Sequence, residues 1–490
     1  MRPLTVVALI AFTGRLAAAQ GSSVIGRTLT LDDAITIARQ NNPTYLQALD
    51  AERNADATVR SAYGSLLPTS SASFSTRFQQ GGQQFFNGVA LSNGSNSLSS
   101  SYNVGVNYNI SAALLLGPKV ARAARDATDA DARGATEALR AAVTDEYLVV
   151  LQAGARANVT DSLLETAKGQ LDLAKARVAV GAATVLDTRR AEVVLGQAEV
   201  GTLTTHNAVQ VEKLRLFQQL GVVVVDTAVQ LTTTFDVAPP AFSRDSVLEI
   251  ARAANPAVNA LRSRLRSAEV DQQVARSGYT PTLSLGTGWG GNSFQYTDPN
   301  FLINRAQAGT LSSLATCATQ DSVRRGAGLA GLDCSKITFS TAYAAALRAS
   351  NAQFPFKFTR APFGMSATIS LPVFDGFRRE QRLEQSEITR QDTRYLLRAR
   401  ELQLNTEVTQ AYLNLITTYR TVALQEQNAA KAREELSYAE ERYRSGAAAF
   451  LDVTTSRGTF AQAQIDRVNS VYDYHRAFAA LEAAVGRPLR

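Results

Sequence analysis

Arg442-Tyr443-Arg444-Ser445-Gly446-Ala447-Ala448-Ala449-Phe450-Leu451-Asp452 lies between two long Ala-rich segments with helical patterns. A similar stretch occurs 265 positions earlier, with Arg, Gly, Ala, Ala, Leu and Asp in the same places: Arg177-Val178-Ala179-Val180-Gly181-Ala182-Ala183-Thr184-Val185-Leu186-Asp187. A glycine lets the chain reverse, and an aspartate a few residues later can accept hydrogen bonds from the first N–H groups of the returning helix. Each copy therefore predicts two long helices joined by a tight turn.

A shorter repeat, with an offset of 213 residues, opens each half of the chain. Residues 30–42 correspond to residues 243–255, and each segment begins with a Thr or Ser that can cap a helix and ends in Asn-Pro. The pattern predicts a short helix of about 11 residues and a second of about 23 residues in each half, because Pro ends one helix and can start the next. We therefore divide the mature chain into two tandem repeats, residues 20–240 and 241–490.

The N-terminus has the features of a secretory signal peptide, residues 1–19. Arg2 precedes an apolar run that ends at Phe12, and three alanines precede Gln20. A membrane anchor is the alternative, but the apolar run is too short to span a bilayer permanently. The chain is therefore expected to be exported.

Period-two alternation predicts β-strands in the middle of each half. Apolar residues alternate with small polar ones along 98–110 and 363–373, with weaker partner strands at 72–78 and 283–289. A transmembrane β-strand needs one face for lipid and one for water, and an edge strand of a soluble sandwich is the alternative. The candidate lipid-facing residues are Val104, Val106, Tyr108, Ile369 and Leu371.

The loops that join these strands differ between the halves. The second loop, from about 290 to 362, is much longer than the first and holds both cysteines, Cys317 and Cys334. We expect a disulfide between them, because an exported chain meets oxidising conditions. A metal site is the alternative, but no His or second Cys pair accompanies the two cysteines.

Charge and histidine content argue against two other classes of function. The formal charge of +7 is spread along helices that also carry Glu and Asp, which indicates a solvated surface rather than a nucleic-acid site. Only His206 and His475 are present, and they lack the spacing of metal ligands. We therefore expect no catalytic residue, no cofactor, no metal site and no enzymatic activity.

Taken together, these features resemble the TolC-like outer-membrane efflux proteins, over essentially all of the mature chain. The resemblance rests on the tandem repeat, the Asn-Pro pairs, the two Arg-x-x-x-Gly turns with Leu-Asp, and the segment Leu371-Pro372-Val373-Phe374-Asp375-Gly376 before the second long helix. It implies a mainly α fold with a small β part: a homotrimer whose chains each give four strands to a β-barrel in the outer membrane, continued by a periplasmic α-helical barrel. Four strands alone cannot close a barrel, which independently favours an oligomer.

The function implied by the resemblance is passive export through the outer-membrane channel of a tripartite efflux or secretion system. Its partners would be outer-membrane lipid, a periplasmic adaptor protein and an inner-membrane pump. The alternative is a periplasmic structural or adhesive coiled-coil protein that a barrel anchors in the membrane. The exported substrate is not encoded in any motif of this sequence.

The two turns are predicted to form the periplasmic tip, and we name Gly181, Asp187, Tyr443, Gly446 and Asp452 as its candidate residues. A trimer would gather the two aspartates of each chain around the mouth of the tunnel. The second copy has Tyr443 where the first has Val178, so a hydrogen bond from Tyr443 to Asp187 could hold the tip closed. The alternative is that both aspartates are simple helix caps.

Overall fold

The computed structural model describes residues 27–82, 84–86, 89–91, 95–223 and 228–489. The expected signal peptide, residues 1–19, lies outside the described residues. The chain divides into two compact units, which are described separately below. Of the described residues, the helical unit holds those within 27–59, 120–269 and 387–489, and the sheet unit holds those within 60–119 and 270–386.

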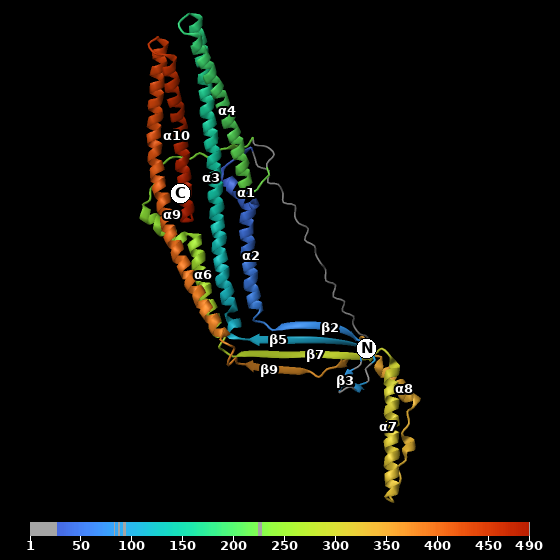
Figure 1. Cartoon of the computed structure of the whole chain (residues 1–490). Coiled ribbons are helices and arrows are strands. Elements are labelled where there is room, and N and C mark those ends of the chain that lie inside the picture. Colours follow the sequence, from blue (N-terminus) through green and yellow to red (C-terminus); the bar gives the residue numbers. More distant parts are fainter. Residues whose placement is uncertain (1–26, 83, 87–88, 92–94, 224–227, 490) are drawn as a thin grey trace. The chain divides into compact units, whose positions relative to one another are not determined.

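Eight helices that the repeats predict are present, and they match in length between the two halves. The first half has α1 (Leu31–Asn41), α2 (Pro43–Gly64), α3 (Ala112–Ala179) and α4 (Val185–Leu220). The second half has α5 (Arg244–Ala254), α6 (Pro256–Ser277), α9 (Arg378–Arg444) and α10 (Phe450–Val485). The helices α3 and α9 have 68 and 67 residues, and each returns through a helix of 36 residues. Figure 1 shows the two resulting hairpins.

The Asn-Pro pairs have a structural role that explains their place in both halves. Asn42 is buried, its amide donates to the carbonyl of Gln219 at the end of α4 (2.8 Å), and its Oδ1 accepts from the N–H of Tyr45 in α2 (3.1 Å). Asn255 does the same with the carbonyl of Ala484 (3.0 Å) and the N–H of Val258 (3.2 Å). One buried side chain thus caps the end of one helix and the start of another.

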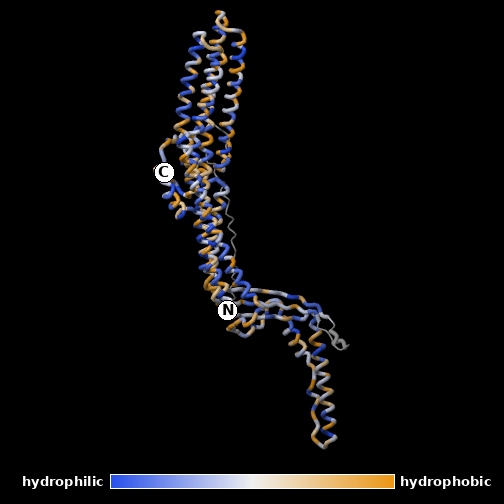
Figure 2. Tube along the Cα trace, turned by 60° about the vertical axis from the view of Figure 1, so that its left-hand side comes forward, coloured by the Kyte–Doolittle hydropathy of each residue, from blue (hydrophilic) through white to orange (hydrophobic). Residues whose placement is uncertain are grey.

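Each half has a large apolar cluster in the helical unit, and a smaller third cluster lies near the tips of the hairpins. The first joins α1, α3, α4 and the short parallel pair β1 (Thr28–Leu29) and β6 (Gln230–Leu231), and Tyr147 at its centre donates to the carbonyl of Leu29 (2.8 Å). The second joins α5, α6, α9 and α10 around Tyr474 and Leu481. Among the described residues, no helix contains an apolar stretch that could span a lipid bilayer. Figure 2 shows hydrophobic and hydrophilic positions interspersed along the helices.

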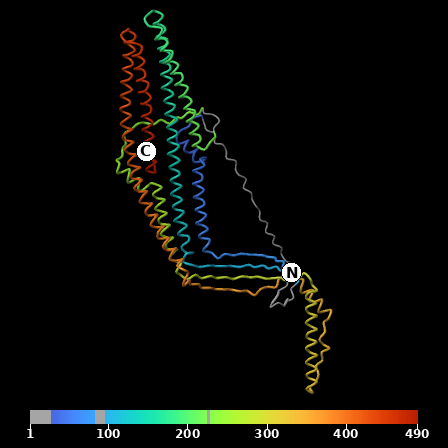
Figure 3. Tube along the Cα trace, viewed as in Figure 1, coloured from blue at the N-terminus to red at the C-terminus, as the bar shows by residue number. Residues whose placement is uncertain are grey.

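The sheet unit is built on four antiparallel strands in the order β2-β5-β7-β9 (Figure 3). They are β2 (Thr69–Gln79), β5 (Ser97–Ile110), β7 (Thr282–Tyr296) and β9 (Gly364–Ser370), and the short β8 (Thr359–Arg360) also pairs with β7. A separate pair is formed by β3 (Gln84–Phe86) and β4 (Val89–Leu91). The four strands expected from the alternation are therefore present.

The strand register gives the sheet two chemically distinct faces, because directly paired residues of antiparallel strands share a face. The pairs Phe74 with Tyr102, Val104 with Trp289, Val106 with Thr287, Tyr108 with Leu285, and Leu283 with Ile369 lie on one face. On the other face, the hydroxyls of Ser75 and Ser101 are 2.9 Å apart. We call the first the apolar face; its Ile369 is 75% exposed in the single chain.

Two expectations for the second half need correction. Leu371, which the alternation placed in a strand, lies just outside β9, because β9 ends at Ser370 and Pro372 has no N–H to extend the ladder. The expected loop from 290 to 362 begins later and is largely helical: β7 runs on to Tyr296. The segment after β7 contains α7 (Pro299–Gly326), the 3₁₀ turn η1 (Cys334–Lys336) and α8 (Thr341–Asn351).

The segment between β7 and β8 is internally cross-linked. Cys317 of α7 and Cys334 of η1 form a disulfide. Asp321, one turn further along α7, accepts from the N–H of Leu332 (2.6 Å) and pairs with Arg325 (3.0 Å). These contacts bind the chain that follows α7 back onto that helix.

Candidate gate at the tips of the helical hairpins

Both hairpin turns have the same backbone geometry. Gly181 and Gly446 have φ values of +75° and +81°, a left-handed conformation that glycine adopts without steric cost. In the first turn, the N–H of Ala182 donates to the carbonyl of Arg177 (2.8 Å), and in the second the N–H of Ala447 donates to the carbonyl of Arg442 (2.8 Å). The repeated glycine therefore ends the outgoing helix in both copies.

Both aspartates at the tips cap the returning helices. The Asp187 carboxylate accepts from the N–H of Thr184 (3.0 Å), and the Thr184 hydroxyl accepts in turn from the N–H of Asp187 (3.3 Å). Asp452 accepts from the N–H of Ala449 (3.1 Å), but Ala449 has no hydroxyl with which to reciprocate. The two carboxylates therefore have the local role that the cap interpretation assigns to them.

Tyr443 lies between the two hairpins and is only 6% exposed. Its ring packs against Phe450, with ring centroids 5.7 Å apart, and belongs to a small cluster that includes Leu171, Ala174 and Val453. Burial raises the pKa of Tyr443. Within the described part of the chain its hydroxyl has no hydrogen-bond partner, so the expected hydrogen bond to Asp187 is not formed.

A different residue, Arg177, connects the hairpins at this point. Its guanidinium donates from α3 to the carbonyl of Tyr443 and to that of Arg444 (3.3 Å), at the end of α9. It also donates to Ala182 of its own turn (3.2 Å), and its Cζ lies 4.4 Å from the centre of the Tyr443 ring. Arg177 therefore combines charged hydrogen bonds with a cation–π contact.

The equivalent residue of the second copy, Arg442, makes a smaller set of contacts. Its described side-chain hydrogen bond goes to Ala447 of its own turn (3.4 Å). The repeated Arg-x-x-x-Gly spacing was a signal that an arginine supports each turn. It did not reveal that the first arginine also reaches the other hairpin, because that contact joins residues 266 positions apart.

A second arginine crosses between the hairpins in the opposite direction. Arg457 of α10 is 6% exposed and donates to the carbonyl of Leu163 in α3 (3.0 Å) and to Gln170. Gln170 donates in turn to the Glu440 carboxylate of α9 (3.1 Å), and burial lowers the pKa of Arg457. The two hairpins of one chain are thus joined by an arginine from each.

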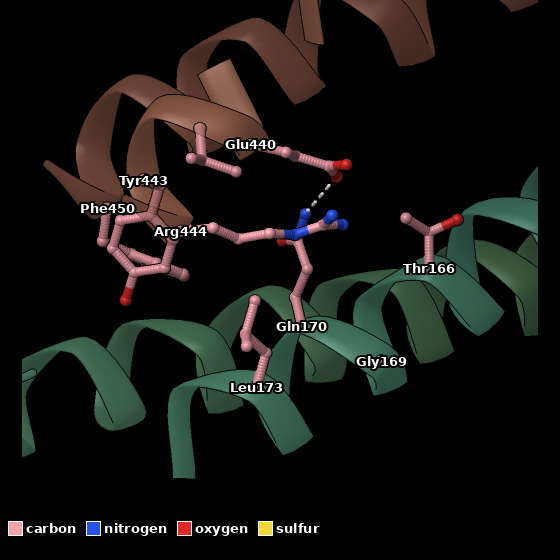
Figure 4. A pocket seen from close by; sticks show the side chains of 9 residues that line it. Thr166, Gly169, Gln170, Leu173, Glu440, Tyr443, Arg444 and Phe450 are labelled. Carbon is pink, nitrogen blue, oxygen red and sulfur yellow. Dashed lines mark hydrogen bonds between the residues drawn. The ribbon is translucent and has the colours of Figure 1, made fainter. Parts of the chain in front are cut away.

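A cavity of about 300 Å³ lies between these contacts. Figure 4 shows Gln170 and Leu173 of α3 on one side, Glu440, Tyr443 and Arg444 on the other, and the hydrogen bond between Gln170 and Glu440 across it.

The two histidines lie away from the tips. His206 Nε2 is 3.0 Å from the Asp161 carboxylate at the surface, and His475 is 2% exposed with its ring 5.3 Å from that of Phe235. In the described ranges, no group of three or more His, Cys, Asp or Glu residues is arranged to hold a metal ion.

Comparison with known proteins relates this arrangement to a family. The sequence model described as outer membrane efflux protein matches residues 34–222 and 337–487. A membrane protein from Pseudomonas aeruginosa has a similar structure, with a TM-score of 0.69, 20% identity, and 93% of each chain covered.

Two further solved structures give similar values. The outer membrane protein VceC from Vibrio cholerae has a TM-score of 0.67 and 16% identity over 94% of this chain and 97% of that one. The MtrE outer membrane channel of Neisseria gonorrhoeae in its open state has a TM-score of 0.66 and 17% identity over 94% and 89%. Comparison of the sequence with curated proteins finds no match.

Proposed function

This chain belongs to the outer membrane efflux protein family, and we propose that three copies of it assemble into one export channel. It is an outer-membrane channel protein of efflux systems and not an enzyme. Family members work with adaptor and pump partners. We propose the same partners here: a periplasmic adaptor at the hairpin tips and an inner-membrane pump that supplies the energy.

The open edges of the sheet carry the trimer proposal. Among the described strands, β2 and β9 each pair on one side only, with β5 and β7 respectively. Unpaired N–H and C=O groups are costly in a bilayer, so each edge needs a partner strand. Pairing β2 of one copy with β9 of the next would close a barrel of twelve strands, wide enough for an aqueous lumen. The apolar face would then meet lipid, and the face with Ser75 and Ser101 would line the lumen.

Reconstitution of the purified protein in a planar lipid bilayer tests this function. Stepwise conductance from a cross-linkable trimer is the expected result. A trimer that anchors in the bilayer without conducting would instead favour the structural or adhesive alternative, and a protein that stays monomeric in the membrane would refute the twelve-stranded barrel.

The hairpin tips are the proposed gate of this channel. The contacts of Arg177 support this role, because they hold the end of α9 against the first turn without burying either turn. The two tip aspartates of each chain would add six carboxylates to the tunnel mouth in a trimer, which favours the passage of cations. In this proposal Arg177 replaces the hydroxyl of Tyr443 as the closing contact, and Tyr443 supplies the ring on which the arginine rests.

A further inference from the structure

The segment between β7 and β9 lies at one defined end of the sheet. The helices α2 and α3 connect to β2 and β5 at Thr69 and Ile110, whereas residues 297–361, which we call the outer segment, follow β7 at its other end, Tyr296. Within the sheet unit, Figure 1 shows α7 and α8 beyond that end of the strands. If the helices are periplasmic, as in the proposed function on which this inference rests, the outer segment is outside the cell.

The last part of the outer segment crosses the apolar face of the sheet. The N–H of Phe354 donates to the Gln295 side chain of β7 (3.1 Å), and the carbonyl of Pro355 accepts from Ser100 of β5. The ring of Phe358 is 4.8 Å from that of Tyr102. These contacts bury Ser100, which is only 2% exposed. The segment is therefore attached to the face that would point toward lipid.

The register places one charged residue on this face. Tyr102 pairs with Gly291, and Gly291 pairs with Arg360 of β8, so Arg360 shares the apolar face with Tyr102. Among the described strand residues, every other side chain that the register places on this face is uncharged. Lys357 and Arg360 are both exposed, and neither has an ion-pair partner among the described residues. A cation on a lipid-facing surface needs a counter-charge or water within reach.

The outer segment does not supply that counter-charge. It contains seven Lys or Arg residues and three acidic residues, all Asp. Each aspartate is already used within the segment: Asp298 caps α7, Asp321 binds Leu332 and Arg325, and Asp333 caps η1. An anion that balances Lys357 and Arg360 would therefore have to come from outside the chain.

An exposed aromatic residue, Phe356, directly precedes Lys357. Its ring stacks against Phe74 of β2 with centroids 6.1 Å apart, yet 72% of the residue remains exposed. Exposed aromatic rings beside cations are typical of the boundary between lipid chains and headgroups. Arginine can bind a phosphate through two parallel hydrogen bonds, and basic residues at such a boundary bind anionic headgroups.

We propose that Phe356, Lys357 and Arg360 form a binding surface for phosphorylated lipid headgroups of the outer leaflet. The ring enters the outermost part of the lipid chains, and the two cations bind the phosphates. This surface attaches the outer segment to the membrane around the channel rather than leaving it to lie over the pore.

The test compares the assembled trimer with a variant carrying Lys357→Gln and Arg360→Gln. The probe is diphosphorylated lipid A in mixed micelles, with dephosphorylated lipid A as the second arm. At about 1 kcal/mol for each basic residue, the variant should bind the phosphorylated lipid about 30-fold more weakly and the dephosphorylated lipid unchanged. Arg394→Gln with Arg398→Gln removes the same charge from exposed positions of α9 and should leave binding at the parent level.

Three results would overturn the proposal: equal binding by the variant, equal loss in the α9 control, or displacement of the lipid by the same concentration of inorganic phosphate.

A second measurement does not depend on affinity. In a Trp289→Phe background, Phe356→Trp should be quenched by lipids brominated near the headgroup, and an unquenched signal would place the ring away from lipid. Bilayer conductance of the same samples separates the two proposals, because a conducting trimer without lipid binding refutes only this one.

Discussion

Replacing Arg177 with alanine should open the channel at its tip. The substitution removes the guanidinium that binds the carbonyls of Tyr443 and Arg444 and that lies 4.4 Å from the Tyr443 ring centre. Hydrogen bonds from a charged donor contribute about 1.5–3 kcal/mol, and a cation–π contact whose cation still reaches water, like that of Arg177, about 0.5–1 kcal/mol. Because one nitrogen serves both carbonyls and water can replace it at an open tip, we expect a loss of about 2–3 kcal/mol per chain. That loss shifts the equilibrium between closed and open hairpins by roughly 30- to 150-fold.

Single-channel recording in planar bilayers measures this shift as longer or larger openings. Arg442→Ala is the matched control, because it removes the equivalent arginine, whose described hydrogen bond stays within its own turn. Tyr443→Phe is a second control and should conduct like the parent, since its hydroxyl has no described partner. Parent-like conductance of Arg177→Ala, or equal opening by Arg442→Ala, would refute the role of this arginine as the closing contact.

Ile369→Asp should block outer-membrane assembly, because it places a charge on the apolar face at a cost of up to a few kcal/mol per chain. Thr368→Asp is the control and should assemble, because residue 368 lies on the opposite face. The amount of heat-resistant trimer on gels measures the assembly of both variants. Replacing Cys317 and Cys334 with serine should destabilise the outer segment by roughly 3 kcal/mol through loop-closure entropy without changing conductance, and faster proteolysis of that segment is the readout. Glu146→Gln should raise the melting temperature at neutral pH, because burial, and then a neighbouring carboxylate, raise the pKa of Glu146 and so make its charged form unfavourable in the folded protein. The advantage of the variant should shrink as the pH falls through that raised pKa, since Glu146 is then uncharged. A difference in melting temperature that persists in acid would contradict this cause.

Local patterns in the sequence were enough to predict most of the elements. The Asn-Pro pairs and the Gly-containing turns repeat at fixed offsets, so each helix could be assigned twice, and alternation along 98–110 identified β5. The assignment of Leu371 to a strand was wrong because alternation alone does not account for the missing N–H of Pro372.

Contacts between distant segments could not be predicted in the same way. Arg177 and Val178 both precede the first turn, and nothing in their spacing says which neighbour of the second hairpin each one meets.

The helix α7 was missed because it is rich in Ala, Ser and Thr and has few large apolar residues, so no clear helical period marks it. Its start is marked by the Asp298 cap.

The disulfide of the outer segment also has a consequence for biogenesis. Thiols are oxidised in the bacterial periplasm, which an exported chain must cross before it reaches the outer membrane. Cys317 and Cys334 are close in sequence, so their bond can form before the sheet is inserted. The machinery that inserts the barrel would then translocate a covalently closed loop rather than an extended chain. Assembly of this channel should accordingly depend on how wide a passage that machinery can open during insertion.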